Sequence, residues 1–315
     1  MIKRRCAILP GIAIVALIVL VAAYSSRIVS GWSQEAGFNA DHPEESGYKL
    51  VFQDDFTNPS TLDIKDTRKE GFNWYMGKFH WGDVSTPEQV VLGPDGLQLG
   101  GRIATATSSF DDRSVIGKAW GGTLYFEALI NLNPTHVFSW KGTGPAFWAL
   151  SWPWSTRSAQ APNMPQGYEN FGELDVMEYG FANKPGSSPD LKHYSQTVHN
   201  WYGIDRTTCK PDAYCEILND DRTVRVPDIR GWHRFGAWLV IGKGGRKSFV
   251  QPYYDGAPVG SARKWPSYAE LKDVPVPPSG SNSYGIFDFE KWIVVLSATM
   301  VTPMKVRYVK IWQAG

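Results

Sequence analysis

Cysteine is scarce in this chain, which has only three in 315 residues. Cys6 lies in an apolar leading segment, so Cys209 and Cys215 form the remaining pair. Half of a metal site is one interpretation of this close spacing, but no second Cys/His cluster at zinc spacing accompanies it. We therefore predict a local disulfide between Cys209 and Cys215, formed in an oxidising compartment.

An excess of charge of one sign is also absent. The formal net charge is +1, and Lys and Arg form no basic run after the N-terminus. Proteins that bind nucleic acid through phosphates need such a basic surface. The composition therefore excludes nucleic acid as an expected partner.

Long segments of helical period and repeats of fixed length are missing as well. The chain instead contains many short β-type runs such as "YKLVFQ" (48–53), "TLYFEALINL" (123–132) and "KVRYVKIWQ" (305–313), separated by Gly-, Pro- and Asp-rich turns. This pattern predicts an all-β sandwich or barrel in a single domain over residues 48–315. We expect the polar segment 206–231 to be a surface loop.

The one long hydrophobic run lies at the start of the chain. Lys3, Arg4 and Arg5 precede an apolar segment that ends near Ala23, with small residues at the positions of a signal-peptidase site. Residues 1–23 are thus either a cleaved signal peptide or an uncleaved membrane anchor, and both remain open. Either one predicts export. Residues 24–47 are polar and are expected to be a tether.

Acidic residues are concentrated in an otherwise apolar stretch, "FGELDVMEYG" (171–180). In a strand, alternate residues share a face, so Glu173 and Asp175 point the same way. Glu178 is out of phase by one residue unless a bulge at Val176 and Met177 returns it to that face. A solvated strand face is the simpler interpretation, but aromatic residues surround the acids in sequence and favour a buried site.

Two carboxyl groups on one face suit the retaining hydrolysis of glycosidic bonds. That reaction needs one ionised carboxylate as nucleophile and one protonated carboxyl as acid, about 5–5.5 Å apart. A third acid between them can help to hold the two protonation states apart. The abundance of aromatic side chains, 14% of the chain with 14 Trp, is also typical of grooves that bind sugar chains.

The segment "ELDVME" resembles the signature of the family-16 glycoside hydrolases in its longer form, which carries a bulge residue and is shared by laminarinase-like and agarase-like members. Further similarities follow in the family's order, among them "LVFQDDFTN" (50–58), "GTGPAFWALSW" (142–152), "GWHRFGAWL" with "YYDGAPV", and "KVRYVKIWQ". The resemblance spans roughly residues 48–313. It implies a jelly-roll sandwich of two antiparallel sheets with a concave substrate cleft.

Carried over by position, the resemblance implies that Glu173 is the nucleophile, Asp175 its helper and Glu178 the general acid/base. It places Trp148 and His199 in the cleft, and strand alternation places Trp201 on the face of His199. Trp120 is expected to form a further platform for sugar, with core packing as the alternative. Trp74, Tyr75 and Trp81 are candidates for a rim, with packing as the alternative.

The chain also departs from the family pattern. Arg307 occupies a position where the family usually carries an acid, through which some members bind calcium, so we carry over no metal from the resemblance and leave a calcium site open, and we expect no cofactor. Thr123 replaces an Arg that many members have before residues 125–132, and "VVLSATM" replaces an Asn-Leu-Ala run. These differences indicate a divergent member and leave the sugar open.

The expected function is an exported, monomeric, endo-acting retaining glycoside hydrolase that cuts internal β-linkages of a glucan-like or galactan-like polysaccharide. A transglycosylase would use the same residues and pass the glycosyl group to another sugar. A lectin on the same fold would keep aromatic platforms but would have no need for all three acids.

Overall fold

The computed structural model describes residues 38–76, 85–111, 115–132, 144–151, 170–180, 189–202, 215–243, 246–267, 284–300 and 302–315. The chain divides into one compact unit at residues 1–39 and another at residues 40–315, and every element described below belongs to the second. In the second unit an ion pair joins Asp41 to Arg234, and the indole of Trp312 donates a hydrogen bond to Glu44. The predicted targeting segment, Trp81 and Cys209 lie outside the described residues.

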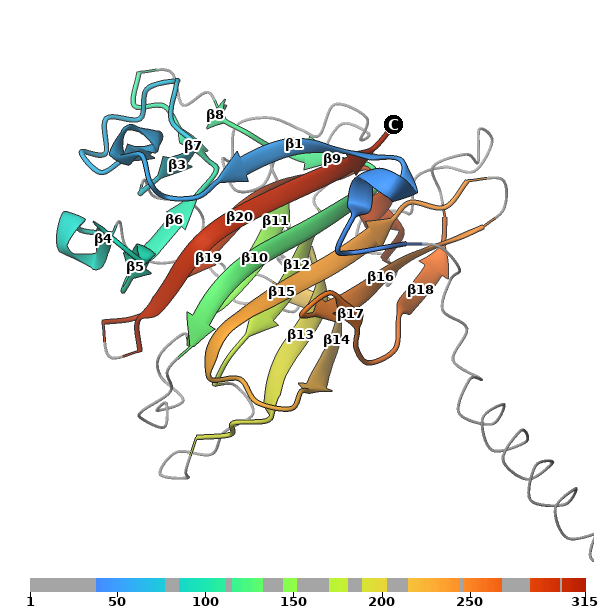
Figure 1. The fold of residues 1–315 in the computed structure, drawn as a ribbon. Helices are drawn as coiled ribbons and strands as arrows, with labels where there is room; N and C mark the ends of the chain where they lie inside the picture. The colour runs from blue at the N-terminus through green and yellow to red at the C-terminus, as the bar shows by residue number, and fades with distance from the viewer. Residues whose placement is uncertain are drawn as a thin grey trace, which may run out of the picture. The chain divides into compact units, whose positions relative to one another are not determined.

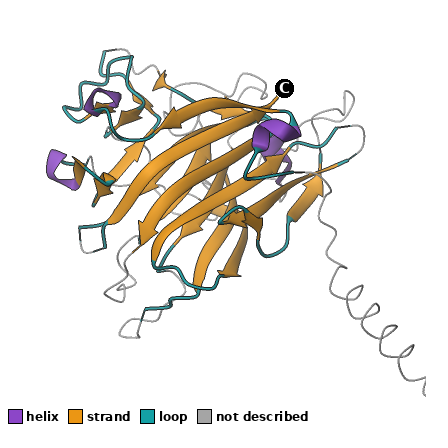
Figure 2. Ribbon diagram, in the orientation of Figure 1, coloured by secondary structure: helices purple, strands orange, loops and turns teal. Residues whose placement is uncertain are grey.

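Two large sheets form the second unit (Figures 1 and 2). In the described residues the first sheet has the spatial order β17 (Ala257–Pro258), β16 (Lys247–Tyr254), β15 (Gly231–Val240), β10 (Leu124–Leu132), β20 (Met304–Ala314), β5 (Gly96–Leu99) and β4 (Val90–Gly93). On this sheet β1 (Tyr48–Asp54) also pairs with β20, and β18 (Arg263–Pro266) pairs with β16.

The second sheet contains the strand with Glu173, Asp175 and Glu178, which we call the acidic strand. Its spatial order is β14 (Cys215–Arg225), β13 (His193–Tyr202), β12 (Asn170–Glu178), β11 (Ala146–Ser151), β19 (Lys291–Ser297), β6 (Arg102–Ala104), β3 (Trp74–Tyr75) and β2 (Leu62–Asp63), with β9 (Trp120–Gly121) paired to β19. All of its described pairs are antiparallel except β2 with β3. A separate hairpin joins β7 (Ala106–Ser108) and β8 (Val115–Gly117), and the short 3₁₀ turns are η1 (Pro43–Ser46), η2 (Pro59–Thr61), η3 (Pro87–Gln89) and η4 (Tyr284–Asp288).

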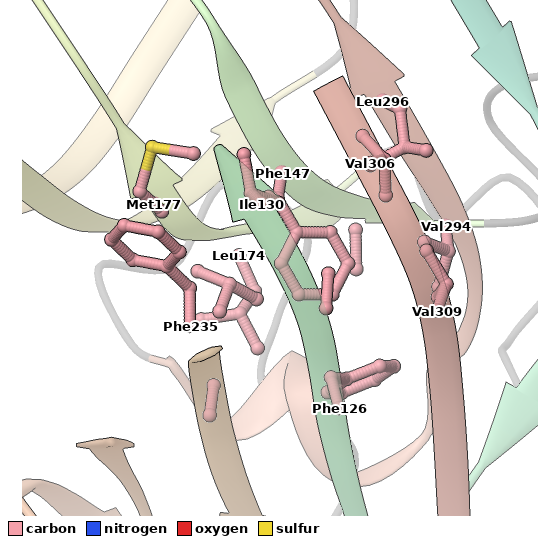
Figure 3. Close-up of a cluster of buried hydrophobic side chains, with 14 of the residues drawn as sticks. Phe126, Ile130, Phe147, Leu174, Met177, Phe235, Val294, Leu296, Val306 and Val309 are labelled. Carbon is pink, nitrogen blue, oxygen red and sulfur yellow. The ribbon is translucent and has the colours of Figure 1, made fainter. Parts of the chain in front are cut away.

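The main hydrophobic core lies between the two sheets. Both sheets direct alternate apolar side chains into it, and Figure 3 labels ten of them: Phe126, Ile130, Phe147, Leu174, Met177, Phe235, Val294, Leu296, Val306 and Val309. Stacking of two apolar sheet faces in this way is the defining packing of a sandwich. The predicted all-β jelly-roll sandwich is thus confirmed.

One segment that was predicted to be a loop is a strand. Residues 215–225 of the segment 206–231 form β14, which pairs with β13 along its length. The polar run "NDDR" suggested a loop because it lacks apolar alternation, but β14 lies at the edge of the sheet, where polar side chains are exposed. Near the C-terminal end of β14, Val224 and Val226 are buried and pack in the core between the sheets.

Long apolar helices are not found among the described residues: none of these forms a helix that could cross a membrane. The predicted anchor lies outside this part of the chain. Cys215 begins β14, and because Cys209 is not described, the disulfide stays a prediction.

Gly172 on β12 provides a test of packing behind the acidic strand. A Cβ at this position would lie 2.7 Å from both Phe287 Cε1 and Trp292 Cη2. We expect Gly172→Ala to lower the free energy of unfolding by about 1–3 kcal/mol, the usual cost of overpacking. Urea denaturation measures this change.

The control for this substitution is Gly93→Ala, because the nearest heavy atom to its Cβ would be Gly96 O at 3.9 Å. Equal stability changes in the two variants would contradict the packing described for Gly172.

Candidate active site

A bulge interrupts the middle of β12. Asp175 pairs with Thr197 on β13, whereas Glu178 pairs with Ser195, so two residues of β12 oppose one residue of β13. The register also shifts against β11, where Asp175 is opposite Trp148 and Glu178 is opposite Ala146. The bulge that the sequence analysis required is therefore present at Val176 and Met177.

The bulge changes which side of the sheet Glu178 faces. Val176 and Met177 are consecutive, yet both are fully buried in the core between the sheets. Glu178 consequently returns to the side that carries Glu173 and Asp175. On this side Ala146, Trp148 and Leu150 of β11 form part of a second apolar cluster. We call this side of the second sheet the acidic face.

Glu173 is held by an aromatic neighbour on β13. Its side chain is only 9% exposed, and the indole Nε1–H of Trp201 donates to Glu173 Oε2 at 2.6 Å. A hydrogen bond to a carboxylate favours the ionised form. Trp201 is positioned in turn by stacking between His199 and Phe171, with ring centroids 5.2 and 6.3 Å away.

Asp175 lies between the two glutamates and pairs with His199. It is 2% exposed, and His199 Nε2 lies 2.9 Å from Asp175 Oδ2. His199 and Trp201 occupy alternate positions of β13, which places both on the acidic face as predicted.

Glu178 has the electrostatic environment of a proton donor. Burial raises its pKa well above the usual range, and the negative charges of Asp175 and Glu173 raise it further. The positive charge that His199 can carry acts in the opposite direction, and Asp221 on β14 adds a small repulsion. Burial and the repulsion from its two neighbours therefore favour the protonated form of Glu178.

Trp148 lies beside the acids, but its indole edge is already paired. It is 5% exposed, and its Nε1–H donates to Ser297 Oγ at 3.1 Å. Ser297 belongs to "VVLSATM", a segment in which the sequence departs from the family pattern. This departure thus supplies the acceptor that orients Trp148.

Arg102 was not identified from the sequence. Its guanidinium carbon is 5.9 Å from the centre of the Trp148 ring. Burial lowers the pKa of Arg102, while the charge of Glu173 acts to raise it, so a cation and this carboxylate lie near each other. The available signal was strand alternation, since Arg102 and Ala104 share a face and Ala104 belongs to the apolar cluster of the acidic face.

The predictions for three other aromatic residues need correction. Trp120 pairs with Trp292, packs 5.0 Å from Phe52 and contacts the core between the sheets, which is the side opposite the acids. Trp120 is therefore a packing residue and not a platform beside the acids. Trp74 and Tyr75 are fully buried, so they form no rim.

The residue of β13 opposite the bulge is held by contacts on the core side of the second sheet. Gln196 lies between the partners of Asp175 and Glu178 and is fully buried. Arg263 on β18 donates hydrogen bonds to the side-chain and backbone oxygens of Gln196 and to Asp220 O. Burial lowers the pKa of Arg263 to about 10, and the carboxylate of Asp220 partly offsets this effect. These contacts connect β18 to the bulge region.

Three of the site residues have the donor types of a metal site. Glu173, Asp175 and His199 each offer one atom within 4.8 Å of the other two, and a divalent cation such as zinc accepts these ligand types. However, His199 Nε2 is occupied by Asp175, and an indole N–H points at Glu173. Both contacts are made within the protein, and the donor types by themselves do not identify a metal site.

No protein-family model matches the sequence, and no curated protein matches it. Among solved structures, the chain is similar to an endo-1,3-beta-glucanase from Streptomyces sioyaensis, with a TM-score of 0.49 and 16% identity over 86% of this chain and 98% of that chain. It is also similar to the exoplasmic/lumenal domain of VIP36 (TM-score 0.33, 12% identity, 80% and 91% covered) and to a putative glycosyl hydrolase from Parabacteroides distasonis (0.28, 10%, 73% and 95%). Likenesses at these levels transfer no function.

The repulsion between Asp175 and Glu178 can be tested without a substrate. Asp175→Asn removes the largest charge contribution to the raised pKa of Glu178, so we expect that pKa to fall. Carbon-13 NMR titration of the glutamate carboxyl groups measures it. Asp221→Asn is the matched control and should cause a smaller decrease, because Asp221 contributes least among the neighbours that affect Glu178. A rise, or no change, in Asp175→Asn would contradict this account of the site.

Proposed function

We propose that this chain is an exported, retaining, endo-acting glycoside hydrolase of β-linked polysaccharides. The observation that carries the proposal is the bulge in β12, which brings Glu178 onto the acidic face with Glu173 and Asp175. Retaining hydrolysis needs two carboxyl groups in opposite protonation states that flank the scissile bond about 5–5.5 Å apart. The fold and the family resemblance of the sequence are consistent with this proposal, but by themselves they are not sufficient evidence for it.

Glu178 is the general acid of the first step. Its raised pKa favours the protonated carboxyl, and it donates this proton to the glycosidic oxygen as the bond breaks. Glu173 is the nucleophile, which attacks the anomeric carbon while the indole N–H of Trp201 stabilises its ionised form. A covalent glycosyl–enzyme results, and the leaving sugar departs with the proton from Glu178.

Asp175 acts through both neighbours. Its charge helps to keep the proton on Glu178 before the first step, and its contact with His199 holds it in place. Once Glu173 has become an ester, one negative charge is lost and the pKa of Glu178 falls, so Glu178 can then accept a proton from water. That water releases the sugar with its configuration retained.

The substrate is proposed as a glucan-like or galactan-like polysaccharide, and Trp148 and Arg102 are proposed to contact it. Transfer of the glycosyl group to a second sugar instead of water would use the same residues. Export and attachment through residues 1–23 are also part of the proposal, as is a substrate cleft on the acidic face.

Removal of either catalytic carboxyl should abolish turnover. We expect Glu173→Gln and Glu178→Gln to lose nearly all activity on the polysaccharide that wild type cleaves best in a panel of β-glucans and galactans, because each change removes one of the two required groups. Reducing-sugar release measures turnover, and thermal unfolding checks the fold. Glu88→Gln, at an exposed position of η3, is the control. Near-normal rates in either active-site variant would rule out the mechanism.

Azide should distinguish the roles of the two glutamates. With an activated substrate, Glu173→Ala plus azide is expected to form a glycosyl azide of inverted configuration, because azide attacks in place of the nucleophile. Glu178→Ala plus azide should give the retained configuration, because the covalent intermediate still forms at Glu173. Proton NMR of the products identifies the anomer, and the opposite pattern would exchange the two assignments.

A further inference from the structure

Glu290 is a buried carboxyl group that the proposed chemistry does not use. It lies between η4 and β19, is 3% exposed, and reaches behind the acidic strand. The inference drawn from it rests on the proposed function, because it concerns how the nucleophile is held.

The contacts of Glu290 join the two strands that carry the site. The hydroxyl of Ser151, the last residue of β11, donates to Glu290 Oε2, and the backbone N–H of Gly172 on β12 donates to Oε1 at 3.2 Å. Gly172 immediately precedes Glu173, and their side-chain positions point to opposite faces of the sheet. Glu290 therefore holds the backbone of β12 from the side opposite the nucleophile.

The space around this contact is tightly filled. The Cα of Gly172 faces Phe287 and Trp292, which leave no room for a Cβ. A Cβ on Gly121 of β9 would lie 2.9 Å from the backbone oxygen of Glu290, so β9 packs closely against the main chain of this residue. Glu290 is thus buried among tightly packed side chains and backbone.

Nothing in the described surroundings balances a negative charge on Glu290. It forms no ion pair within the described residues. The nearby charged residues along the chain are Asp288, which bonds to Ser248 and Ser267, and Lys291, whose side chain is exposed. On β12 the closest is Glu173, on the other face. Burial raises the pKa of Glu290 to about 8, and the bonds from Ser151 and Gly172 only partly oppose this effect.

We propose that Glu290, as a neutral carboxylic acid, is a positioning residue that ties β11 to the Gly172 amide and so fixes the backbone from which Glu173 projects. A neutral carboxyl can keep both contacts: one oxygen accepts from the Gly172 N–H, and between its hydroxyl and that of Ser151 either group can donate, whereas a carboxylate can only accept from Ser151. Loss of the proton would leave an uncompensated charge inside the sandwich, which destabilises the folded state.

The first test concerns protonation and needs no substrate. Between pH 4.5 and about 8 the folded protein holds a proton on Glu290 that the unfolded chain has released, so stability falls as pH rises through this range. In Glu290→Gln this contribution disappears, and the dependence of the unfolding free energy on pH should decrease by about one proton. Urea denaturation at a series of pH values measures it, with Glu88→Gln as control. An unchanged dependence would overturn the neutral state.

The second test concerns positioning and is also independent of turnover. The indole N–H resonance of Trp201, assigned with Trp201→Phe, reports the hydrogen bond to Glu173 in nitrogen-15 NMR spectra. We expect Glu290→Leu, which removes both contacts, to shift this resonance, while Glu290→Gln at pH 6 leaves it near its wild-type position. An unshifted resonance in folded Glu290→Leu would overturn the positioning role.

Kinetics on the polysaccharide found by the panel complete the design. Glu290→Leu should lower kcat roughly tenfold to hundredfold with little change in KM, as expected when a reacting group is misplaced. Glu290→Gln should retain kcat at pH 6. An unchanged kcat in Glu290→Leu would overturn the positioning role, whereas absence of turnover in wild type would refute the proposed function and leave the stability and NMR results to decide on Glu290.

Discussion

The register shift in β12 is the constraint on which the rest of the site depends. A strand that alternates regularly would send Glu178 into the core between the sheets, where an acid would have to be buried among apolar side chains. The extra residue instead places both Val176 and Met177 in that core and returns Glu178 to the acidic face. One local irregularity therefore satisfies the core and assembles three acids at the same time.

Bringing three acids together is electrostatically unfavourable, because their negative charges repel one another. The surrounding side chains offset this repulsion to different degrees for each acid. The N–H of Trp201 and the guanidinium of Arg102 lie near Glu173, and His199 pairs with Asp175. Glu178 has fewer neighbours that stabilise a negative charge. Because burial and repulsion both disfavour its ionised form, its protonated form is favoured. The preference of Glu178 for its proton thus follows from its neighbours.

Support for these strands comes from the core side of the second sheet. Arg263 bonds to Gln196 opposite the bulge, and Glu290 bonds to Gly172 beside the nucleophile. Both are charged residue types in a buried setting, but their surroundings favour different states. Arg263 has carbonyl oxygens and Asp220 to stabilise its charge, whereas Glu290 has only a hydroxyl and one amide. Burial without a counter-charge favours the neutral acid.

The sequence by itself determined the all-β fold, most of the strands and the acids on β12, because alternation, turn residues and the spacing of Glu173, Asp175 and Glu178 are local properties. It could not identify β14 as a strand, because the pairing of a polar edge strand is decided by its neighbour. Nor could the sequence show that Trp148 lies on the acidic face whereas Trp120 packs against the core between the sheets. Both residues lie in strands, and only the packing of the sheets decides which side each one faces. Arg102 and Glu290 became recognisable only in the tertiary structure, because their roles arise from contacts with residues distant in the chain, and burial and charge compensation depend on those contacts.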